Sequence, residues 1–249
     1  MKAPLLLDVR CLAVSDGPGI RTAFFVKGCP LRCLWCHNPE SQSPEPQIAR
    51  FQHLCRHCVK CEMSEATCPT RAFKIYGKSM SISEIVAEAL EDKAFYDESG
   101  GGVTLSGGEP LLYWEWALEL FKAFKAAGLH TCLDTSLFAA PEVIDAILPV
   151  TDVWLPDFKA ADDDLHRRCT GVANAPIKAN LKRLVDLAYH DMARSKYLAL
   201  GMPVGEAPAL WERPLRSSMQ SRIHLSAPSD HGMQLNSPTR MGASGVGRQ

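Results

Sequence analysis

The stretch AFFVKGCPLRCLWCHNPE, residues 23–40, joins an apolar run to a loop that holds three cysteines. The run AFFVKG, at 23–28, is short and apolar, which predicts a buried β-strand. The cysteines after it are Cys29, Cys33 and Cys36. Because parallel strands present functional residues at their carboxyl ends, this loop predicts a ligand-binding site at that edge of a sheet.

The composition is that of a soluble globular protein, with 249 residues, 46% hydrophobic and 22% charged. One large domain, or one domain with an insert, is the expectation. The formal net charge of −1 argues against a nucleic-acid partner held by overall basicity. The beginning MKAPLLLDVR has an apolar run of only three leucines, so we expect no signal peptide, no membrane span and a cytoplasmic protein.

Cysteine usage is the strongest compositional signal. The chain has ten cysteines, and seven of them fall between Cys29 and Cys68. Disulfides are rare in a reducing compartment, so this density indicates metal or cluster ligation. The other three, Cys11, Cys132 and Cys169, stand apart and are interpreted as small buried hydrophobic residues.

Strand and helix patterns alternate along most of the chain. The segment 81–96 predicts a helix with a capping box of Ser81 and Glu84 and an apolar face. That face comprises Ile82, Ile85, Val86, Ala89 and Leu90. GVTLSGGEP at 102–110 predicts a strand, a glycine turn and a helix start at Pro110.

The alternation continues to about residue 204. A helix with Ala117, Leu120, Phe121 and Phe124 facing inward is expected to stop at Gly128. Strands at 130–136 and 152–158, helices near 141–148 and at 177–194, and a strand in YLALGMPV at 197–204 follow. This pattern predicts an α/β fold with parallel strands, forming a partial (β/α) barrel over residues 7–204.

Two segments break the alternation. Residues 48–75 form a cysteine-rich insert that is too short for its own apolar core, so a bound metal would have to hold it together. Residues 205–249 lose all periodicity and are rich in Ser, Pro, Gly, Gln and Arg, which predicts a disordered tail.

The three clustered cysteines admit two interpretations. Structural zinc normally has four ligands, and His37 beside Cys36 could supply the fourth. A 4Fe-4S cluster has four irons, so three thiolates hold three of them and leave one iron open to an exogenous ligand. The spacing CxxxCxxC, with Trp35 before the last cysteine, resembles the signature of the radical S-adenosylmethionine (SAM) enzymes. In that superfamily the amino and carboxylate groups of SAM chelate the open iron.

Further motifs narrow the resemblance. SDGPGIRT at 15–22, DKAFYDESGGGVTLSGGEP at 92–110, HTCLDTS at 130–136, DFK at 157–159 and H..CTG..N at 166–174 stand in this order. Together with the cysteine loop they resemble the glycyl-radical-enzyme activating enzymes, the pyruvate formate-lyase activase group, from about Leu7 to Leu187.

The resemblance implies a specific reaction. One electron enters the cluster, SAM splits into methionine and a 5'-deoxyadenosyl radical, and that radical removes a hydrogen atom from a glycine of a partner glycyl radical enzyme. A flavodoxin- or ferredoxin-like protein would donate the electron. The cluster and SAM carry the chemistry, and the protein supplies orientation, a dry pocket and access.

The resemblance also implies roles for polar residues at the strand ends. Gly107 and Gly108 would let backbone carbonyls approach the SAM ammonium, although they could simply form a strand-to-helix turn. Glu109 is either part of that site or a helix-start charge. Within the stretch Asp157, Phe158 and Lys159, the two charged residues would hold the amino and carboxylate ends of SAM, unless they form a solvated surface pair.

Five residues receive further assignments. Asp134 would help to hold a monovalent cation near SAM, or would cap a helix. His166, on a polar loop, would either approach the substrate glycine or be solvated. Trp35 is expected to pack over the cluster loop, and Cys36 and His37 would meet the adenine through their backbone.

The insert predicts a second site. Cys55, Cys58, Cys61 and Cys68 resemble a ferredoxin-like run, although the last gap is longer. A second 4Fe-4S cluster is the preferred interpretation. A four-cysteine zinc site, or a mixed site with His57 or His53, is the alternative.

The C-terminal part departs from the resemblance. GMPVGEAP at 201–208 replaces a motif that contains an arginine in the related family, which predicts a truncated or altered product with an exposed sheet edge. Two alternatives therefore stand beside the activating enzyme. One is a radical SAM enzyme acting on a small metabolite, and the other is a non-catalytic iron–sulfur or zinc protein.

Overall fold

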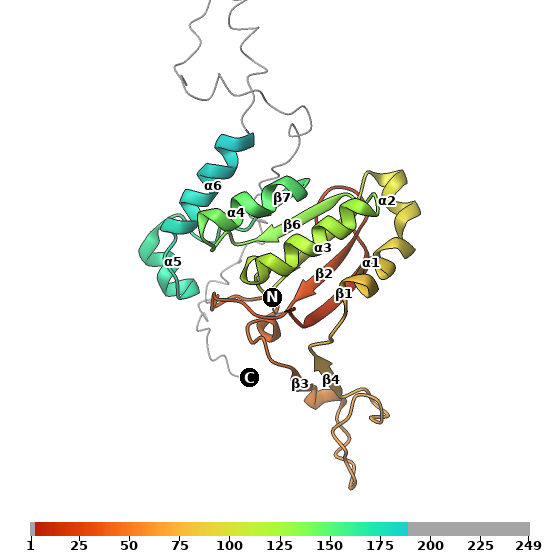
Figure 1. Cartoon of the computed structure of the whole chain (residues 1–249). Coiled ribbons are helices and arrows are strands. Elements are labelled where there is room, and N and C mark those ends of the chain that lie inside the picture. Colours follow the sequence, from red (N-terminus) through yellow and green to blue (C-terminus); the bar gives the residue numbers. More distant parts are fainter. Residues whose placement is uncertain (1–2, 189–249) are drawn as a thin grey trace, which may run out of the picture.

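The computed structural model describes residues 3–188, with side chains up to residue 185, and has an α/β fold (Figure 1). Five strands form one sheet in the order β1-β2-β5-β6-β7. They are β1 Leu6–Ala13, β2 Arg21–Val26, β5 Gly102–Gly107, β6 Thr131–Thr135 and β7 Val153–Pro156. Strands β3 Gln47–Arg50 and β4 Phe73–Tyr76 form a separate hairpin. The tail predicted at 205–249 and the strand predicted at 197–204 lie outside the described residues.

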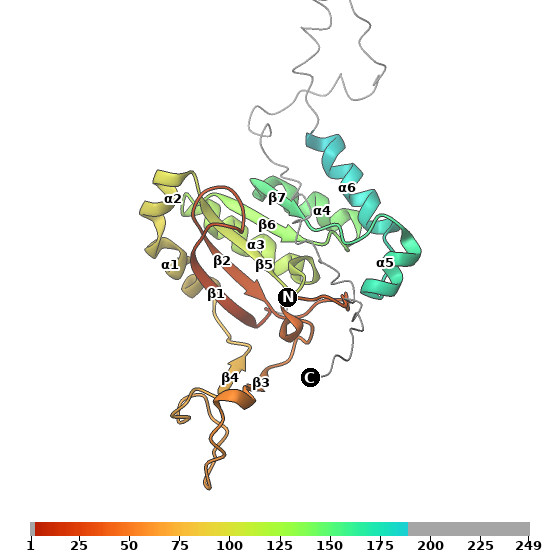
Figure 2. The ribbon, with the colours of Figure 1, turned by 180° about the vertical axis from the view of Figure 1, so that it is seen from behind.

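Helices cover one face of the sheet, and further helices lie beside its carboxyl edge (Figures 1 and 2). The helices are α1 Ile82–Glu91, α2 Lys93–Ser99, α3 Trp114–Ala126, α4 Pro141–Ile147, α5 Asp163–Thr170 and α6 Ala175–Ala188. Short 3₁₀ turns occupy Pro39–Ser41, Gln52–Leu54, Pro110–Tyr113 and Leu148–Val150. Among these described helices, none has the length and apolar content that a bilayer crossing requires.

The predicted parallel sheet is confirmed for β2, β5, β6 and β7, which pair in parallel in that order. Strand β1 was not predicted, and it pairs with β2 in the antiparallel direction. Its register shifts between Leu6 and Asp8 and again between Arg10 and Ala13. These irregularities break the alternation of period two by which a strand is recognised in a sequence. The predicted burial is confirmed for Cys132 on β6, but it is wrong for Cys11 on the edge strand β1, which is exposed, and Cys169 is only partly buried.

Helix α1 begins with the predicted capping box. The Ser81 hydroxyl accepts the Glu84 N–H at 3.2 Å, and the Glu84 carboxylate accepts the Ser81 N–H at 2.7 Å. Ile85 and Ala89 are fully buried, but Leu90 is 40% exposed, so its assignment to the apolar face is wrong. The helix is interrupted at Asp92, and α2 begins directly after it. Helix α2 is capped at its C-terminus by Gly100, which has the left-handed conformation (φ 67°).

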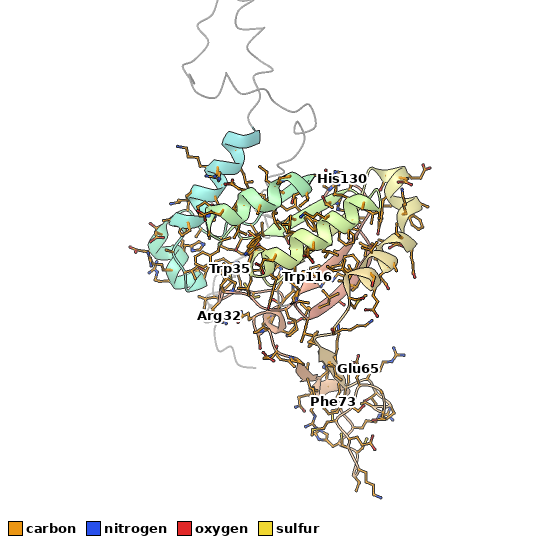
Figure 3. The ribbon with its side chains drawn as sticks, viewed as in Figure 1. Arg32, Trp35, Glu65, Phe73, Trp116 and His130 are labelled. Atoms are coloured by element: carbon orange, nitrogen blue, oxygen red, sulfur yellow. The ribbon has the colours of Figure 1, made fainter. Side chains whose placement is uncertain are left out.

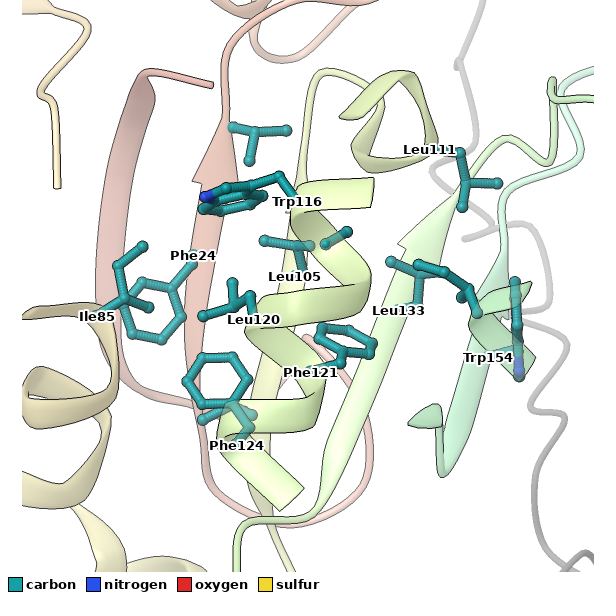
Figure 4. Packing of buried hydrophobic residues seen from close by; sticks show 14 of the residues in the cluster. Phe24, Ile85, Leu105, Leu111, Trp116, Leu120, Phe121, Phe124, Leu133 and Trp154 are labelled. Atoms are coloured by element: carbon teal, nitrogen blue, oxygen red, sulfur yellow. The ribbon is translucent and has the colours of Figure 1, made fainter. Parts of the chain in front are cut away.

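The main core lies between α3 and the sheet (Figure 4). The predicted inward face of α3 is confirmed, because Ala117, Leu120, Phe121 and Phe124 have no exposed surface. The rings of Phe124 and Phe24 of β2 lie 5.9 Å apart, and Leu105 and Leu133 of β5 and β6 complete this layer. Burial of these side chains stabilises the helix on the sheet and thereby fixes the strand ends that follow.

The amino edge of the sheet brings two of the sequence motifs together. The N–H of Ile20, from SDGPGIRT, donates to Ser99 Oγ at 2.8 Å, and the Ile20 carbonyl accepts Gly102 N–H at 3.2 Å. A Cβ on Gly101 would lie 1.8 Å from that carbonyl oxygen, so only glycine fits there. The two motifs therefore meet at the end of the sheet opposite the cysteine loop.

Arg21 is the buried cation of this edge. Its guanidinium donates to Thr104 Oγ1 at 2.7 Å and to the carbonyls of Val103 at 2.6 Å, Pro18 at 3.0 Å and His130 at 3.2 Å. Burial lowers its pKa, and nearby Cys132 and Asp152 oppose that shift. Arg21 thus satisfies carbonyl groups from three separate segments.

We expect Arg21→Ala to lower the free energy of unfolding by about 3 kcal/mol or more, because several buried acceptors lose their donor. The matched control is Arg183→Ala, which removes a half-exposed ion pair with Asp145 and should lower the free energy of unfolding far less, because solvent screens that pair. Urea unfolding of both variants measures the difference. Equal losses would contradict the structural role of Arg21.

Candidate functional site

The parallel strands end at one edge of the sheet and deliver the predicted site residues there. Val26 of β2 pairs with Gly107 of β5, and Asp134 of β6 pairs with Leu155 of β7. The cysteine loop, the Gly107–Glu109 turn and the segment from Asp157 to Lys159 follow these positions directly. The register therefore places segments far apart in sequence at a common rim.

The loop with the three cysteines is closed at its base. The N–H of Gly28 donates to the Ser41 carbonyl at 2.6 Å, and the N–H of Cys29 donates to the Gln42 carbonyl at 3.3 Å. Lys27, which is fully buried, donates from Nζ to the Glu40 carbonyl and to Gln47 Oε1 at 3.0 Å. These bonds hold the cluster loop, residues 28–42, at the end of β2 and tie it to the start of β3.

The three thiols suit a cluster that takes three protein ligands. Cys29, Cys33 and Cys36 are free and partly exposed. Burial raises the pKa of Cys29 to about 11 and also raises that of Cys33, so metal binding must release protons. Within residues 3–188, no three His, Cys, Asp or Glu side chains are close enough to hold a single metal ion. The donor set fits a 4Fe-4S cluster because thiolates are the ligands that such clusters take.

Gly107 and Gly108 lie against the base of the cluster loop. A Cβ on Gly107 would lie 2.3 Å from Val26 N, and a Cβ on Gly108 would lie 2.2 Å from the carbonyl oxygen of Gly28. Backbone bonds of 2.8 Å run from Gly108 N–H to Val26 O and from Glu109 N–H to Gly28 O. Close packing therefore requires both glycines, and the approach of their carbonyls to SAM stays a prediction.

Glu109 connects two strand ends. Its carboxylate is 1% exposed and accepts from Thr135 Oγ1 at 2.6 Å, Ser136 N–H at 2.9 Å, the Ser136 hydroxyl, and Leu111 N–H at 3.1 Å. Burial raises its pKa, and these hydrogen bonds oppose the rise. The Leu111 bond caps the 3₁₀ turn, which agrees with the helix-start alternative.

Three charged residues face the rim. Asp157 and Lys159 form an ion pair with each other, and their side chains are 50% and 22% exposed. Burial lowers the pKa of Lys159, but Asp157, Cys33 and Asp134 together raise it by more, so the ammonium form is favoured. Asp134 accepts a hydrogen bond from Ser106 Oγ at 2.6 Å, and the N-cap of α4 is Ala140, so the helix-cap alternative for Asp134 is wrong.

His166 differs from its prediction in position and in exposure. It lies on helix α5, and its side chain has no exposed surface. The sequence predicts a polar loop because Asp162, Asp163 and Asp164 precede it, but Asp162 is the N-cap that starts the helix and accepts Leu165 N–H at 2.7 Å. The imidazole stacks on Phe158 with ring centroids 6.4 Å apart.

Trp35 does not pack over the cluster loop as predicted. Its side chain is 47% exposed and the neighbouring Leu34 is 78% exposed. His37 is exposed as well. Figure 3 shows Trp35 and Arg32 near the carboxyl edge of the sheet, far from His130 at the amino edge. The apolar side chains of Leu34 and Trp35 therefore face solvent.

The insert projects from the body as a hairpin with a long connection (Figures 1 and 2). Strands β3 and β4 pair from Gln47 with Tyr76 to Arg50 with Phe73, and the four cysteines lie between them. Cys58 and Cys61 are exposed, and Cys55 and Cys68 are partly exposed. Glu65 and Phe73 mark this part in Figure 3.

Several polar residues of the site escaped the sequence analysis. Lys27, Ser106, Thr135 and Ser136 all support the rim, but within the quoted motifs they received no role of their own. One signal was available, because Lys27 and Ser106 are polar residues inside otherwise apolar strand runs. Buried polar groups of that kind need partners, and these partners come from segments distant in sequence.

The model of the radical SAM superfamily matches residues 24–207, which is more than half of the chain. The chain belongs to the radical SAM superfamily. The matched range contains the cluster loop, the Gly107–Glu109 turn and the Asp157–Lys159 pair.

The relatives of this radical SAM protein are activating enzymes. The (2S)-3-sulfopropanediol dehydratase activating enzyme of Klebsiella oxytoca is 37% identical, over 80% of this chain and 71% of that protein. The benzylsuccinate synthase activating enzyme of Thauera aromatica is 36% identical, over 74% of this chain and 65% of that protein. The trans-4-hydroxy-L-proline dehydratase activating enzyme of Clostridioides difficile is 35% identical, over 74% of this chain and 70% of that protein. Within the superfamily, the chain groups with the glycyl-radical-enzyme activating enzymes.

A solved domain of a pyruvate-formate lyase-activating enzyme from Bacteroides vulgatus has a TM-score of 0.34 and 21% identity. It covers 51% of this chain and 100% of that domain.

Asp134 gives the site a measurable pH dependence. Burial, together with the nearby carboxylates of Asp157 and Glu109, raises its pKa to about 6, while Ser106 and Lys159 oppose the rise. Between about pH 4 and pH 6, Asp134 is therefore protonated in the folded chain but ionised in the unfolded chain. Stability from this residue falls as the pH rises through that window and is constant above it.

We expect Asp134→Asn to remove this penalty while keeping an acceptor for Ser106. Between pH 4.5 and 6.5 the wild-type protein should lose unfolding free energy relative to the variant, and above pH 7 the two curves should run parallel. Urea unfolding of both proteins across this range makes the measurement, and titrating groups far from Asp134 cancel in the difference. Parallel curves throughout would contradict the raised pKa.

Proposed function

We propose that this radical SAM protein activates a glycyl radical enzyme by removing a hydrogen atom from one of its glycine residues. The observation that carries the proposal is the rim, where a loop of three thiols lies beside a paired carboxylate and ammonium. The relatives with 35–37% identity, which are activating enzymes, support it. When bound, the cluster and SAM supply one-electron cleavage of SAM and hydrogen-atom removal from carbon.

The residues of the chain bind and orient these groups. Cys29, Cys33 and Cys36 would hold the cluster. Lys159 is suited to the carboxylate of SAM and Asp157 to its ammonium, because each end of the amino acid needs a partner of opposite charge. Charges near Cys33 include both of these side chains, which supports a common site.

Two partner proteins are part of this proposal. The glycine-bearing enzyme must reach the rim, and a flavodoxin- or ferredoxin-like donor must deliver an electron to the cluster. The exposed Leu34 and Trp35 of the cluster loop supply apolar contact area at the point where a partner would approach. We place the protein in the cytoplasm, since seven of its ten cysteines are clustered in a pattern that suits metal ligation and not disulfides.

We propose a second 4Fe-4S cluster in the insert. The backbone N–H of His57 and the guanidinium of Arg50, whose Nη2 lies 3.0 Å from Cys55 Sγ, lower the pKa of Cys55. The hydroxyl of Thr70 lowers the pKa of Cys68. Thiols with lowered pKa ionise more readily, which favours metal ligation at neutral pH.

Changing Cys29, Cys33 or Cys36 singly to Ala should abolish SAM cleavage and remove up to one cluster's worth of iron, because no other cysteine lies in that loop. The measurement is iron content and 5'-deoxyadenosine after anaerobic reconstitution and reduction with SAM. Cys132→Ala, at a buried cysteine outside the rim, is the control and should retain both. Cleavage that persists in any of the three variants would refute the assignment.

The insert can be tested separately. The double variant Cys58→Ala, Cys61→Ala should lose one cluster's worth of iron while SAM cleavage survives, because the hairpin lies outside the rim. Metal analysis of the reconstituted wild type distinguishes iron from zinc. Zinc in the wild type, or no loss of iron in the variant, would contradict the second cluster.

A further inference from the structure

The last turn of helix α5 is bonded to the cluster loop. The N–H of Arg32 donates to the Thr170 carbonyl at 2.7 Å, and the N–H of Leu34 donates to the Cys169 carbonyl at 2.9 Å. Carbonyls at the end of a helix lack partners within the helix. Here the loop between Cys29 and Cys36 supplies those partners, so the position of α5 and the position of the loop depend on each other.

The same helix is bonded to the segment that follows Lys159. Asn174, 1% exposed, donates from Nδ2 to the carbonyls of Ala160 and Ala161, both at 3.0 Å. Its own N–H donates to Asp163 Oδ1 at 2.7 Å, in the first turn of α5. The turn after the Asp157–Lys159 pair is thereby attached, through Asn174, to the first turn of α5.

His166 lies between these two attachments. Its Nδ1 is 2.8 Å from the Val172 carbonyl, which can only accept, so Nδ1 carries the proton. Thr170 Oγ1 lies 3.0 Å from this Nδ1 and donates to the His166 carbonyl at 2.8 Å, which holds the turn whose carbonyls meet the cluster loop. The imidazole ring of His166 also stacks on Phe158, which lies between Asp157 and Lys159 in the sequence.

We propose that His166, Thr170 and Asn174, the α5 latch, are positioning residues that set the distance between the cluster loop and the Asp157–Lys159 pair. The proposal rests on the proposed function, in which SAM contacts the cluster and this pair at once. A ligand that bridges two segments binds well only if their separation is fixed in advance. A displacement of about 1 Å in such a site can cost about 100-fold in rate.

The latch can be tested in the metal-free chain, without any activity. Thr170→Val removes the hydroxyl, and Thr151→Val is the matched control, since Thr151 is also fully buried and donates to the carbonyl four residues before it, Ile147, at 3.0 Å. Hydrogen exchange at the amides of Arg32 and Leu34, followed by NMR, is the readout. We expect at least about tenfold faster exchange in Thr170→Val and no change in Thr151→Val.

Two substitutions of His166 sharpen the test. The amide of Asn can take the place of Nδ1–H, whereas the longer Gln places its amide near Nε2. His166→Asn should therefore keep the amides of Arg32 and Leu34 protected, and His166→Gln should not. Unchanged exchange in Thr170→Val, or an equal rise in Thr151→Val, would overturn the proposal. If His166→Gln does not fold, the threonine pair decides.

The second readout is SAM binding to the reconstituted protein. In Asn174→Ala and Thr170→Val we expect iron content equal to wild type, a dissociation constant for SAM about tenfold higher, and an altered response of the reduced cluster's electron paramagnetic resonance spectrum to SAM. Wild-type affinity in both variants would overturn the positioning role. A wild-type protein that binds iron but never cleaves SAM would refute the proposed function alone, because the exchange experiment still decides whether the latch exists.

Discussion

The site depends on the close backbone contact between the carboxyl ends of strands β2 and β5. Val26 pairs with Gly107, and beyond that pair the backbone of Gly108 approaches the carbonyl of Gly28 so closely that a Cβ would lie 2.2 Å from it. This approach joins the cluster loop to the Gly107–Glu109 turn, because Glu109 N–H donates to that same carbonyl at 2.8 Å. A side chain at position 108 would separate the two loops that form the rim.

Buried polar side chains fix both ends of the sheet. At the amino edge, Arg21 satisfies carbonyls of Pro18, Val103 and His130. At the carboxyl edge, Glu109 accepts from the end of β6, and Lys27 donates to the chain beyond the cysteines. Removing any of these three side chains would leave buried hydrogen-bonding groups without a partner. The three side chains therefore hold the loops in one arrangement.

The rim combines charges that a zwitterionic ligand would balance. Asp134 has a raised pKa because it is buried near Asp157 and Glu109, and Lys159 is the cation that offsets this charge. A bound cationic group would favour the ionised form of Asp134 and lower its pKa. A ligand of opposite charge would thus offset the repulsion between the carboxylates of the rim. Helix α5, as proposed above, fixes the separation between the cluster loop and the Asp157–Lys159 pair.

The sequence by itself determined the elements and the chemistry that depend on local pattern. The strand before the cysteines, the capping box of Ser81 and Glu84, the inward face of α3 and the placement of the charged residues at strand ends follow from periodicity and spacing over a few residues. The superfamily follows from the CxxxCxxC loop. Each of these signals lies within one short segment, which is why it could be read without the fold.

Only the tertiary structure decided which distant segments meet. The irregular edge strand β1, the burial of His166, the partners of Glu109 and Arg21, and the contact of α5 with the cluster loop all join residues far apart in sequence. His166 was misplaced because three aspartates before it indicate solvent, although one of them caps a helix whose other face is buried. A buried polar group needs a hydrogen-bond partner, and here the packing of the sheet places that partner beside it from a segment distant in sequence.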